Sequence, residues 1–140
     1  MATQTPGSIV HVEIQSNDPG TTKRFFRDIF GWKLEEYPEM DYTMWKASSG
    51  VGGGFTKPQG GMNPGTLNHI LSREIADDVR KIEASGGAIL VPKTEIPGQG
   101  WFAVFREPGG AVLGLFQAGP RLRPVPKKAK ARKKGKGRRK

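Results

Sequence analysis

The sequence predicts an α+β protein made of two βαβββ modules, and three observations lead to this fold class. Stretches with the two-residue alternation of strands and stretches with helical periodicity follow in the order strand, helix, strand, strand, strand, and this order then recurs. A glycine ends each predicted helix, at Gly31 and Gly86, 55 residues apart. The final strands of the two halves, GVGGGF and AVLGLF, end at Phe55 and Phe116, 61 residues apart. Element order and offsets together indicate an internal duplication.

The first predicted module begins with a strand at Ile9–Gln15, where apolar side chains occupy every second position. Asp18 followed by Pro19 is typical of a helix start, because aspartate caps free N–H groups and proline fits the first turn. Gly31 is placed to end this helix in a left-handed conformation. The apolar stripe of the helix consists of Thr22, Phe25, Phe26, Ile29 and Phe30. Three strands are predicted to follow, at Trp32–Tyr37, Tyr42–Ala47 and Val51–Lys57.

A linker rich in glycine and proline runs from Lys57 to Gly65, and the second module starts with a strand at Thr66–Leu71. Ser72 is a candidate cap for a helix that continues to about Ala84. The apolar positions of this helix are Ile75, Val79 and Ile82, and Gly86-Gly87 closes it. Its three following strands are predicted at Ala88–Pro92, Trp101–Arg106 and Ala111–Gln117.

The net charge of +10 belongs to one end of the chain. Residues 1–120 carry eleven Lys and Arg against thirteen Asp and Glu, whereas residues 121–140 carry twelve Lys and Arg and no acid. We therefore expect a domain at residues 1–118, with modules of about 8–58 and 65–118, and a disordered basic tail at residues 119–140. A sparse apolar content and mutual repulsion are the reasons to expect disorder in this tail.

The composition excludes several classes of site. The chain has no cysteine, so disulfides, thiolate metal sites and cysteine nucleophiles are ruled out. No apolar run is long enough to span a bilayer, and the N-terminus lacks the pattern of a secretory signal. We expect a cytoplasmic protein.

Two segments carry a resemblance to a known family. The stretch HVEIQSNDPGTTKRFFRDIFGWKLEEY at residues 11–37 resembles the opening strand and helix of the glyoxalase/bleomycin-resistance/extradiol-dioxygenase (vicinal oxygen chelate) superfamily. The stretch VPKTEIPGQGWFAVFREPGGAVLGLFQ at residues 91–117 resembles its closing strands. The match covers about residues 8–118 and is nearest to the uncharacterised glyoxalase-related branch. It implies paired βαβββ modules whose partly open, antiparallel or mixed sheets curve around a cavity, and it implies a homodimer.

In metal-dependent members of the family, four ligands come from the first and last strands of each module. The first of these positions falls on His11, and the second falls in the run Gly52–Gly54, which offers no side chain. The third falls near Leu67, and a slip of two residues would bring His69 there; the fourth falls on Gly114. A divalent site needs three or four nitrogen or oxygen ligands, so we expect no cofactor. If a metal is bound, His11 is its candidate ligand.

Five residues are candidates for binding a small molecule in the cavity. His11 and Glu13 share one strand face, which points either to the cavity or to solvent. His69 lies among apolar neighbours and is either a structural histidine or part of a site. Trp101 and Phe105 share a face of their strand and line either a pocket or the core. No catalytic residue is assigned.

Three functions remain open. The first is a small-molecule-binding domain that is metal-independent or has a degenerate metal site. The second is a divalent-metal-dependent lyase, isomerase or dioxygenase of the same superfamily. The third is a protein that associates with nucleic acid or another polyanion through residues 121–140, because clustered cations release counterions from phosphates. These residues could instead bind an anionic membrane surface, or they could be an extension without function. The cations of this third function are Lys127, Lys128, Lys130, Arg132, Lys133, Lys134, Lys136, Arg138, Arg139 and Lys140.

Overall fold

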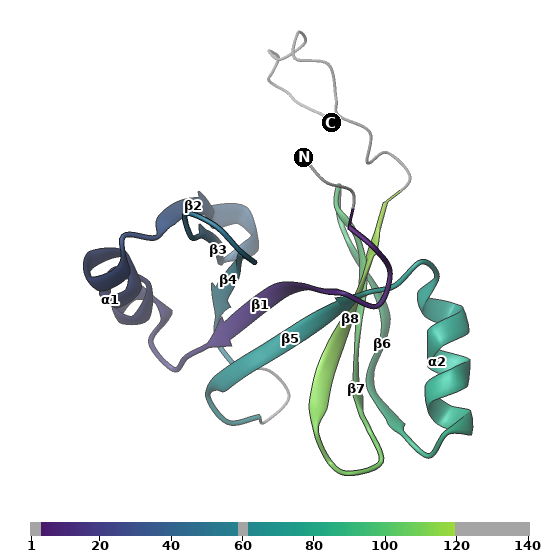
Figure 1. The fold of residues 1–140 in the computed structure, drawn as a ribbon. Helices are drawn as coiled ribbons and strands as arrows, with labels where there is room; N and C mark the ends of the chain where they lie inside the picture. Colours follow the sequence, from purple (N-terminus) through teal and green to yellow (C-terminus); the bar gives the residue numbers. More distant parts are fainter. Residues whose placement is uncertain (1–3, 59–61, 120–140) are drawn as a thin grey trace, which may run out of the picture.

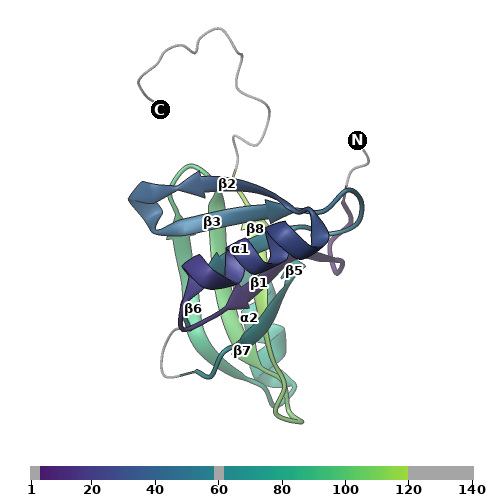
Figure 2. The ribbon, with the colours of Figure 1, turned by 90° about the vertical axis from the view of Figure 1, so that its left-hand side faces the viewer.

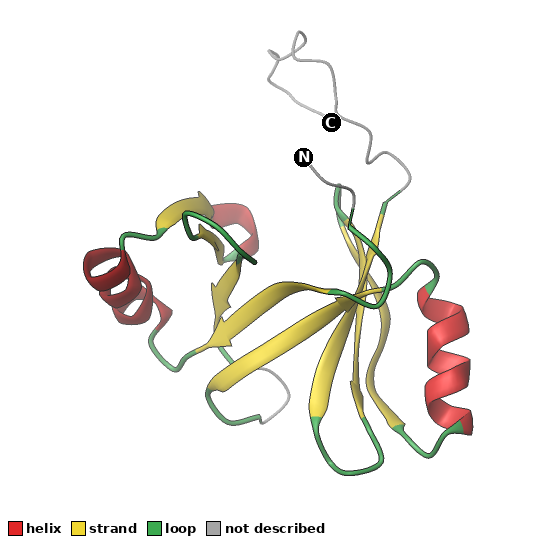
Figure 3. Cartoon of the chain, viewed as in Figure 1, coloured by secondary structure: helices red, strands yellow, loops and turns green. Residues whose placement is uncertain are grey.

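The computed structural model describes residues 4–58 and 62–119, which form two helices, one short 3-10 helix and eight strands (Figures 1 and 3). The first module comprises β1 (Ile9–Gln15), α1 (Pro19–Phe30), β2 (Lys33–Tyr37), the 3-10 turn η1 (Pro38–Met40), β3 (Tyr42–Lys46) and β4 (Gly53–Thr56). The second comprises β5 (Gly65–Leu71), α2 (Ile75–Ala84), β6 (Ala88–Ile96), β7 (Gly100–Arg106) and β8 (Val112–Ala118). The predicted order of two βαβββ modules is confirmed.

All eight strands form one mixed sheet in the order β2-β3-β4-β1-β5-β8-β7-β6. Within each module the first strand runs parallel to the last, since β1 pairs with β4 and β5 pairs with β8. The two modules meet where β1 and β5 pair in antiparallel fashion. The sheet curves strongly, with α1 outside one half and α2 outside the other (Figures 1 and 2). We call the face turned away from the helices the inner face.

The ends of α1 follow from the residues that the sequence places there. The side chain of Asp18 accepts a hydrogen bond from the N–H of Thr21 at 3.2 Å, and Pro19 occupies the first turn. At the other end, Gly31 adopts a φ of 73° and donates its N–H to Arg27. This left-handed conformation is open to glycine at low cost, so the helix ends where the sequence predicts.

Two boundaries in the second module differ from the prediction by more than one residue. α2 begins at Ile75 and its N-cap residue is Glu74 rather than the predicted Ser72, because the N–H of Ser72 is donated to Phe116 of β8 and its hydroxyl is donated to Asp78. The free N–H of Ile75 instead meets the side-chain oxygen of Gln117 at 2.7 Å. β6 continues past Pro92 to Ile96, which an edge strand allows because its proline needs no ladder partner on the open side.

Each helix covers its own apolar cluster on the outer face. Under α2, Ile75, Ala103, Phe105 and Leu115 are buried together, and Val79 and Ile82 pack against them as predicted. Under α1 the cluster is aromatic: Phe26 stacks on Trp32, which stacks on Trp45, and all three approach Phe55. The predicted stripe of α1 is wider than the surface it buries, since three of its members are more than half exposed. These are Phe25, Ile29 and Phe30.

Residues 59–61 of the predicted linker and residues 120–140, which hold nearly all of the predicted tail, lie outside the described residues. Among the helices that are described, none is long and apolar enough to cross a bilayer.

Candidate functional site

The polar side chains of β1 lie on the inner face, at the centre of the sheet. Strand alternation separates His11, Glu13 and Gln15 from the apolar Val12 and Ile14, which point toward the helices. The direction is fixed by the neighbouring strand: Ile14 is opposite Phe55 of β4, which packs against Phe26 of α1, so the adjacent Glu13 points to the inner face. Because β1 pairs with β4 on one side and with β5 on the other, both modules flank these three polar residues.

The side chain of Tyr42, at the start of β3, covers Gly54 of β4, which is opposite Glu13. Its hydroxyl lies 2.8 Å from Nε2 of His11 and donates a hydrogen bond to Glu13 at 3.1 Å. The side-chain amide of Gln15 donates to the other oxygen of Glu13 at 3.0 Å. We call His11, Glu13, Gln15 and Tyr42 the inner-face network. The network joins residues that are 31 positions apart in the sequence.

The hydrogen bonds of the network determine which ring nitrogen of His11 carries the proton. A tyrosine hydroxyl has one proton, and here that proton goes to the Glu13 carboxylate. Nε2 of His11 must then be the donor toward the hydroxyl oxygen, which leaves Nδ1 as the acceptor of a neutral imidazole. The network thus fixes the tautomer of His11.

His69 of β5 extends the network into the second module. It is directly opposite His11 in the β1–β5 ladder, and the two rings meet edge to face with centroids 5.3 Å apart. The side chain of His69 is buried, and its Nδ1 has no hydrogen-bond partner among the described residues. The structure therefore brings together three of the five predicted site residues, namely His11, Glu13 and His69.

Two glycines make room for these side chains. A Cβ atom at Gly54 would collide with the hydroxyl and ring of Tyr42, and one at Gly114 would collide with the imidazole of His69. The register shows the same relation in both modules, because Glu13 is opposite Gly54 and His69 is opposite Gly114. The missing side chains of β4 and β8 are thus replaced in space by Tyr42 and His69.

Burial keeps the two histidines and the tyrosine of this site neutral. Burial first, and then the neighbouring His69, lowers the pKa of His11 to about 4. Burial also lowers the pKa of His69 below its ordinary value. Burial first, and then the carboxylate of Glu13, raises the pKa of Tyr42. Around neutral pH both imidazoles and the phenol are therefore uncharged.

The residues present do not fit the four-ligand metal centre that the family resemblance implies. Gly54 and Gly114 have no donor, the space above them holds Tyr42 and His69, and Leu67 occupies the third position. His69 lies two residues beyond the third ligand position at Leu67. It is opposite His11 in one ladder and opposite Gly114 in the other. Across residues 4–58 and 62–119, no three His, Asp or Glu side chains form a group suited to a metal ion.

The two aromatic candidates lie elsewhere. Phe105 is buried in the apolar cluster under α2, and Trp101 packs against that cluster with Nζ of Lys93 4.9 Å from its ring centre. Both are therefore on the outer face, and the structure does not bring them together with His11 or Glu13. The residue that sequence reasoning missed is Tyr42, because only the pairing of β3 with β4 carries it over Gly54.

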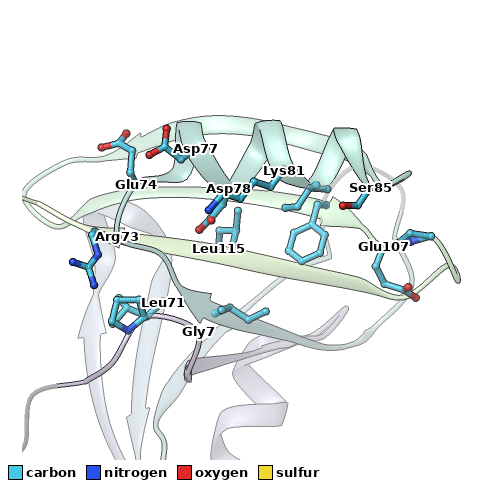
Figure 4. Close-up of a pocket in the computed structure, with 15 residues that line it drawn as sticks. Gly7, Leu71, Arg73, Glu74, Asp77, Asp78, Lys81, Ser85, Glu107 and Leu115 are labelled. Atoms are coloured by element: carbon cyan, nitrogen blue, oxygen red, sulfur yellow. The ribbon is translucent and has the colours of Figure 1, made fainter.

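A cavity of about 610 Å³ lies on the outer face, between α2, the start of the chain and the end of β5 (Figure 4). Its floor is apolar and includes Phe105, Leu115 and Ile82. The acids on its rim are engaged within the protein: Asp78 accepts from Ser72, and Glu107 accepts from the N–H groups of Gly109 and Ala111. This cavity shares no residue with the inner-face network.

Comparison with known proteins yields a family match over part of the chain. The model of the bleomycin resistance protein-like N-terminal family matches residues 8–48, which include β1, α1, β2 and β3. CFP32 of Mycobacterium bovis, whose assignment as a glyoxylase is itself provisional, is 28% identical over 115 residues. That alignment covers 76% of this chain and 44% of the relative, so the chain spans less than half the length of this relative.

Solved structures share the fold at low sequence identity. Methylmalonyl-CoA epimerase from Mycobacterium tuberculosis matches with a TM-score of 0.63 and 14% identity, covering 87% of this chain and 95% of the epimerase. A glyoxalase/bleomycin resistance protein/dioxygenase superfamily member from Vibrio splendidus matches with a TM-score of 0.58 and 15% identity, covering 79% of this chain and 97% of the other. By its partial family match, its glyoxylase-named relative and its fold, the chain is similar to members of the glyoxalase/bleomycin-resistance/dioxygenase superfamily.

Proposed function

We propose that this protein binds a small organic molecule on its inner face without the help of a metal ion. The observation that carries the proposal is the Tyr42 hydroxyl, which joins His11 and Glu13 from a different strand. Buried polar networks of this kind hold side chains in one geometry, as a specific binding site requires. The site would recognise its ligand by hydrogen bonds rather than by coordination.

Three features support the metal-independent form of the proposal. The last-strand positions of both modules are glycine, the first-strand position of the second module is Leu67, and the vacated space is filled by the protein's own side chains. The acceptors that remain for a ligand include Nδ1 of the neutral His11 and the unused lone pairs of the Glu13 carboxylate. With a pKa of about 4, His11 is a weak base, which favours a binding role over proton abstraction.

The test is a small-molecule library screened by protein-observed NMR, followed by affinity measurement on two matched variants. Tyr42→Phe removes the hydroxyl at the centre of the network, whereas Tyr37→Phe removes the hydroxyl of its cross-strand neighbour, which bonds neither His11 nor Glu13. We expect Tyr42→Phe to weaken a hit about ten-fold and Tyr37→Phe to leave it nearly unchanged. Equal affinity of both variants and wild type would refute the proposed site.

A metal-dependent lyase, isomerase or dioxygenase is the alternative use of the same face. It would need His11 together with a set of ligands other than the glycine positions of β4 and β8. Elemental analysis that finds about one metal per chain, and loses it in His11→Ala, would favour this alternative.

The basic residues beyond the domain support a second candidate function. Twelve Lys and Arg without any acid at residues 121–140 would bind nucleic acid or another polyanion through counterion release. No aromatic residue lies in this segment, so binding would be insensitive to base sequence.

A further inference from the structure

The hydrogen bonds of the inner-face network leave an excess of acceptors. Three donors of the network are used inside it: His11 donates to Tyr42, and both Tyr42 and Gln15 donate to Glu13, so that one N–H of the Gln15 amide is the donor left over. The acceptors that remain for a ligand include the lone pair on Nδ1 of His11, the free lone pairs of the Glu13 carboxylate and the amide oxygen of Gln15. A ligand that satisfies these groups must therefore bring hydrogen-bond donors.

The charge of the network is also uncompensated. Glu13 is half-buried, and its two hydrogen-bond partners, the phenol of Tyr42 and the amide of Gln15, are both neutral. Ion pairs in the described residues join lysines and arginines to other acids, and none of them involves Glu13. By strand alternation, the cations of β2 and β3 on this face are Lys33 and Lys46. These two lysines are opposite each other in the β2–β3 ladder, and Lys46 lies four residues along β3 from Tyr42. Charges removed from water are normally paired, so a counter-charge is missing here.

Next to this carboxylate the inner face becomes apolar. Leu67 is opposite Glu13 across the β1–β5 ladder, and Val104 is opposite Gly114, beside His69; both are buried. Phe116 follows on the same face, two residues beyond Gly114. Nδ1 of the nine-tenths buried His69, whose ring lies over Gly114, also has no hydrogen-bond partner among the described residues. A matching ligand combines a donor-rich polar end with an apolar body.

From this arrangement we propose that the site selects organic cations, namely a primary ammonium or a related charged nitrogen attached to an aryl or alkyl body. The ammonium supplies the donors and the counter-charge that Glu13 lacks, and the body covers the half-buried Phe116, beside the buried Leu67 and Val104. An anionic ligand would meet the Glu13 carboxylate with no cation in the network to offset it. This inference rests on the proposed function and specifies the ligand class of the same site.

Three probes with one apolar body and different charges test the ligand class. At neutral pH benzylamine is a cation, benzyl alcohol is neutral and benzoate is an anion. Each is titrated into the full chain while the NMR signals of inner-face residues are followed, and the titration is repeated with Glu13→Gln and with Glu35→Gln. Glu35 lies on the same face of β2 by strand alternation, opposite Met44 and outside the network, so its variant removes an equal charge nearby.

We expect benzylamine to bind about ten-fold more tightly than benzyl alcohol, the gain of one charged hydrogen bond, and benzoate to bind most weakly. Glu13→Gln should reduce the preference for benzylamine to less than about three-fold, and Glu35→Gln should leave it within about two-fold of wild type. Equal binding of the amine and the alcohol at inner-face signals, lost in Tyr42→Phe, would overturn the ligand class but leave the proposed site standing. Binding of none of the three, or equal effects of the two glutamate variants, would overturn the inference as well. If no compound of the larger library binds this face either, the proposed function itself fails.

Discussion

His11 and His69 are opposite each other in the β1–β5 ladder, with ring centroids 5.3 Å apart and ring planes at 80°. The two strands belong to different modules, so the pair marks the point where the duplicated halves meet. Both rings are largely buried, and burial lowers the pKa of each. Protonating either one would place a charge beside a second imidazole in a poorly hydrated site.

This pair predicts a dependence of stability on pH. The pKa of His11 is about 4 in the folded chain and about 6.5 when unfolded, so the unfolded state binds the proton first as pH falls. The free energy of unfolding should therefore be highest above pH 6.5 and decrease as pH falls toward 4, with at most about 3 kcal/mol from His11. Urea unfolding of wild type and His11→Asn between pH 7.5 and 4.5 measures this. The decrease should be smaller in the variant; equal decreases would show that His11 ionises normally.

The two glycines of the site predict a second effect. Gly54→Ala should displace Tyr42 and break its bonds to His11 and Glu13, at a cost of about 1–3 kcal/mol in unfolding free energy. Gly20→Ala is the control, since a Cβ there meets only ordinary contacts at 3.6 Å in the first turn of α1. It should be neutral or stabilising by up to about 1 kcal/mol.

A double-mutant cycle separates this cause from a general effect of filling β4. In a Tyr42→Ala background the collision is gone, so Gly54→Ala should cost much less than it does in wild type. Additive costs in the double variant would show that Tyr42 does not occupy the space over Gly54.

Much of the fold follows from local sequence signals, and the site follows only in part. The ends of α1 are encoded by Asp18, Pro19 and Gly31, so they could be predicted. The start of α2 could not, because the group that meets its first N–H is Gln117, 42 residues away on β8. The inner-face direction of β1 follows from alternation, whereas the contact with Tyr42 depends on strand pairing that no local pattern contains. Trp101 and Phe105 have the same periodicity as pocket residues, and only their packing under α2 distinguishes them.

The basic segment predicts a salt-dependent interaction. Removal of residues 121–140 should leave folding intact and abolish non-specific nucleic-acid binding, because the remaining residues carry two more acids than bases. For the full chain, log affinity should fall linearly with log salt, with a slope of about −0.9 per phosphate neutralised on duplex DNA and about −0.7 on single strands. Filter or fluorescence titrations of both forms on unrelated oligonucleotides measure this. Equal binding by the truncated form would place the interaction in the domain, and no binding by the full chain at low salt would remove the role.

We propose the inner-face network as a small-molecule site that works without a metal. The most direct measurement is an NMR titration of the strongest library hit into the full chain, dialysed against EDTA, with the shifted residues mapped onto the structure. The account predicts unchanged affinity after dialysis and shifts at Tyr42, Glu13 and His69. Loss of binding that added divalent metal restores, or shifts confined to the α2 cavity around Ile82 and Leu115, would contradict it.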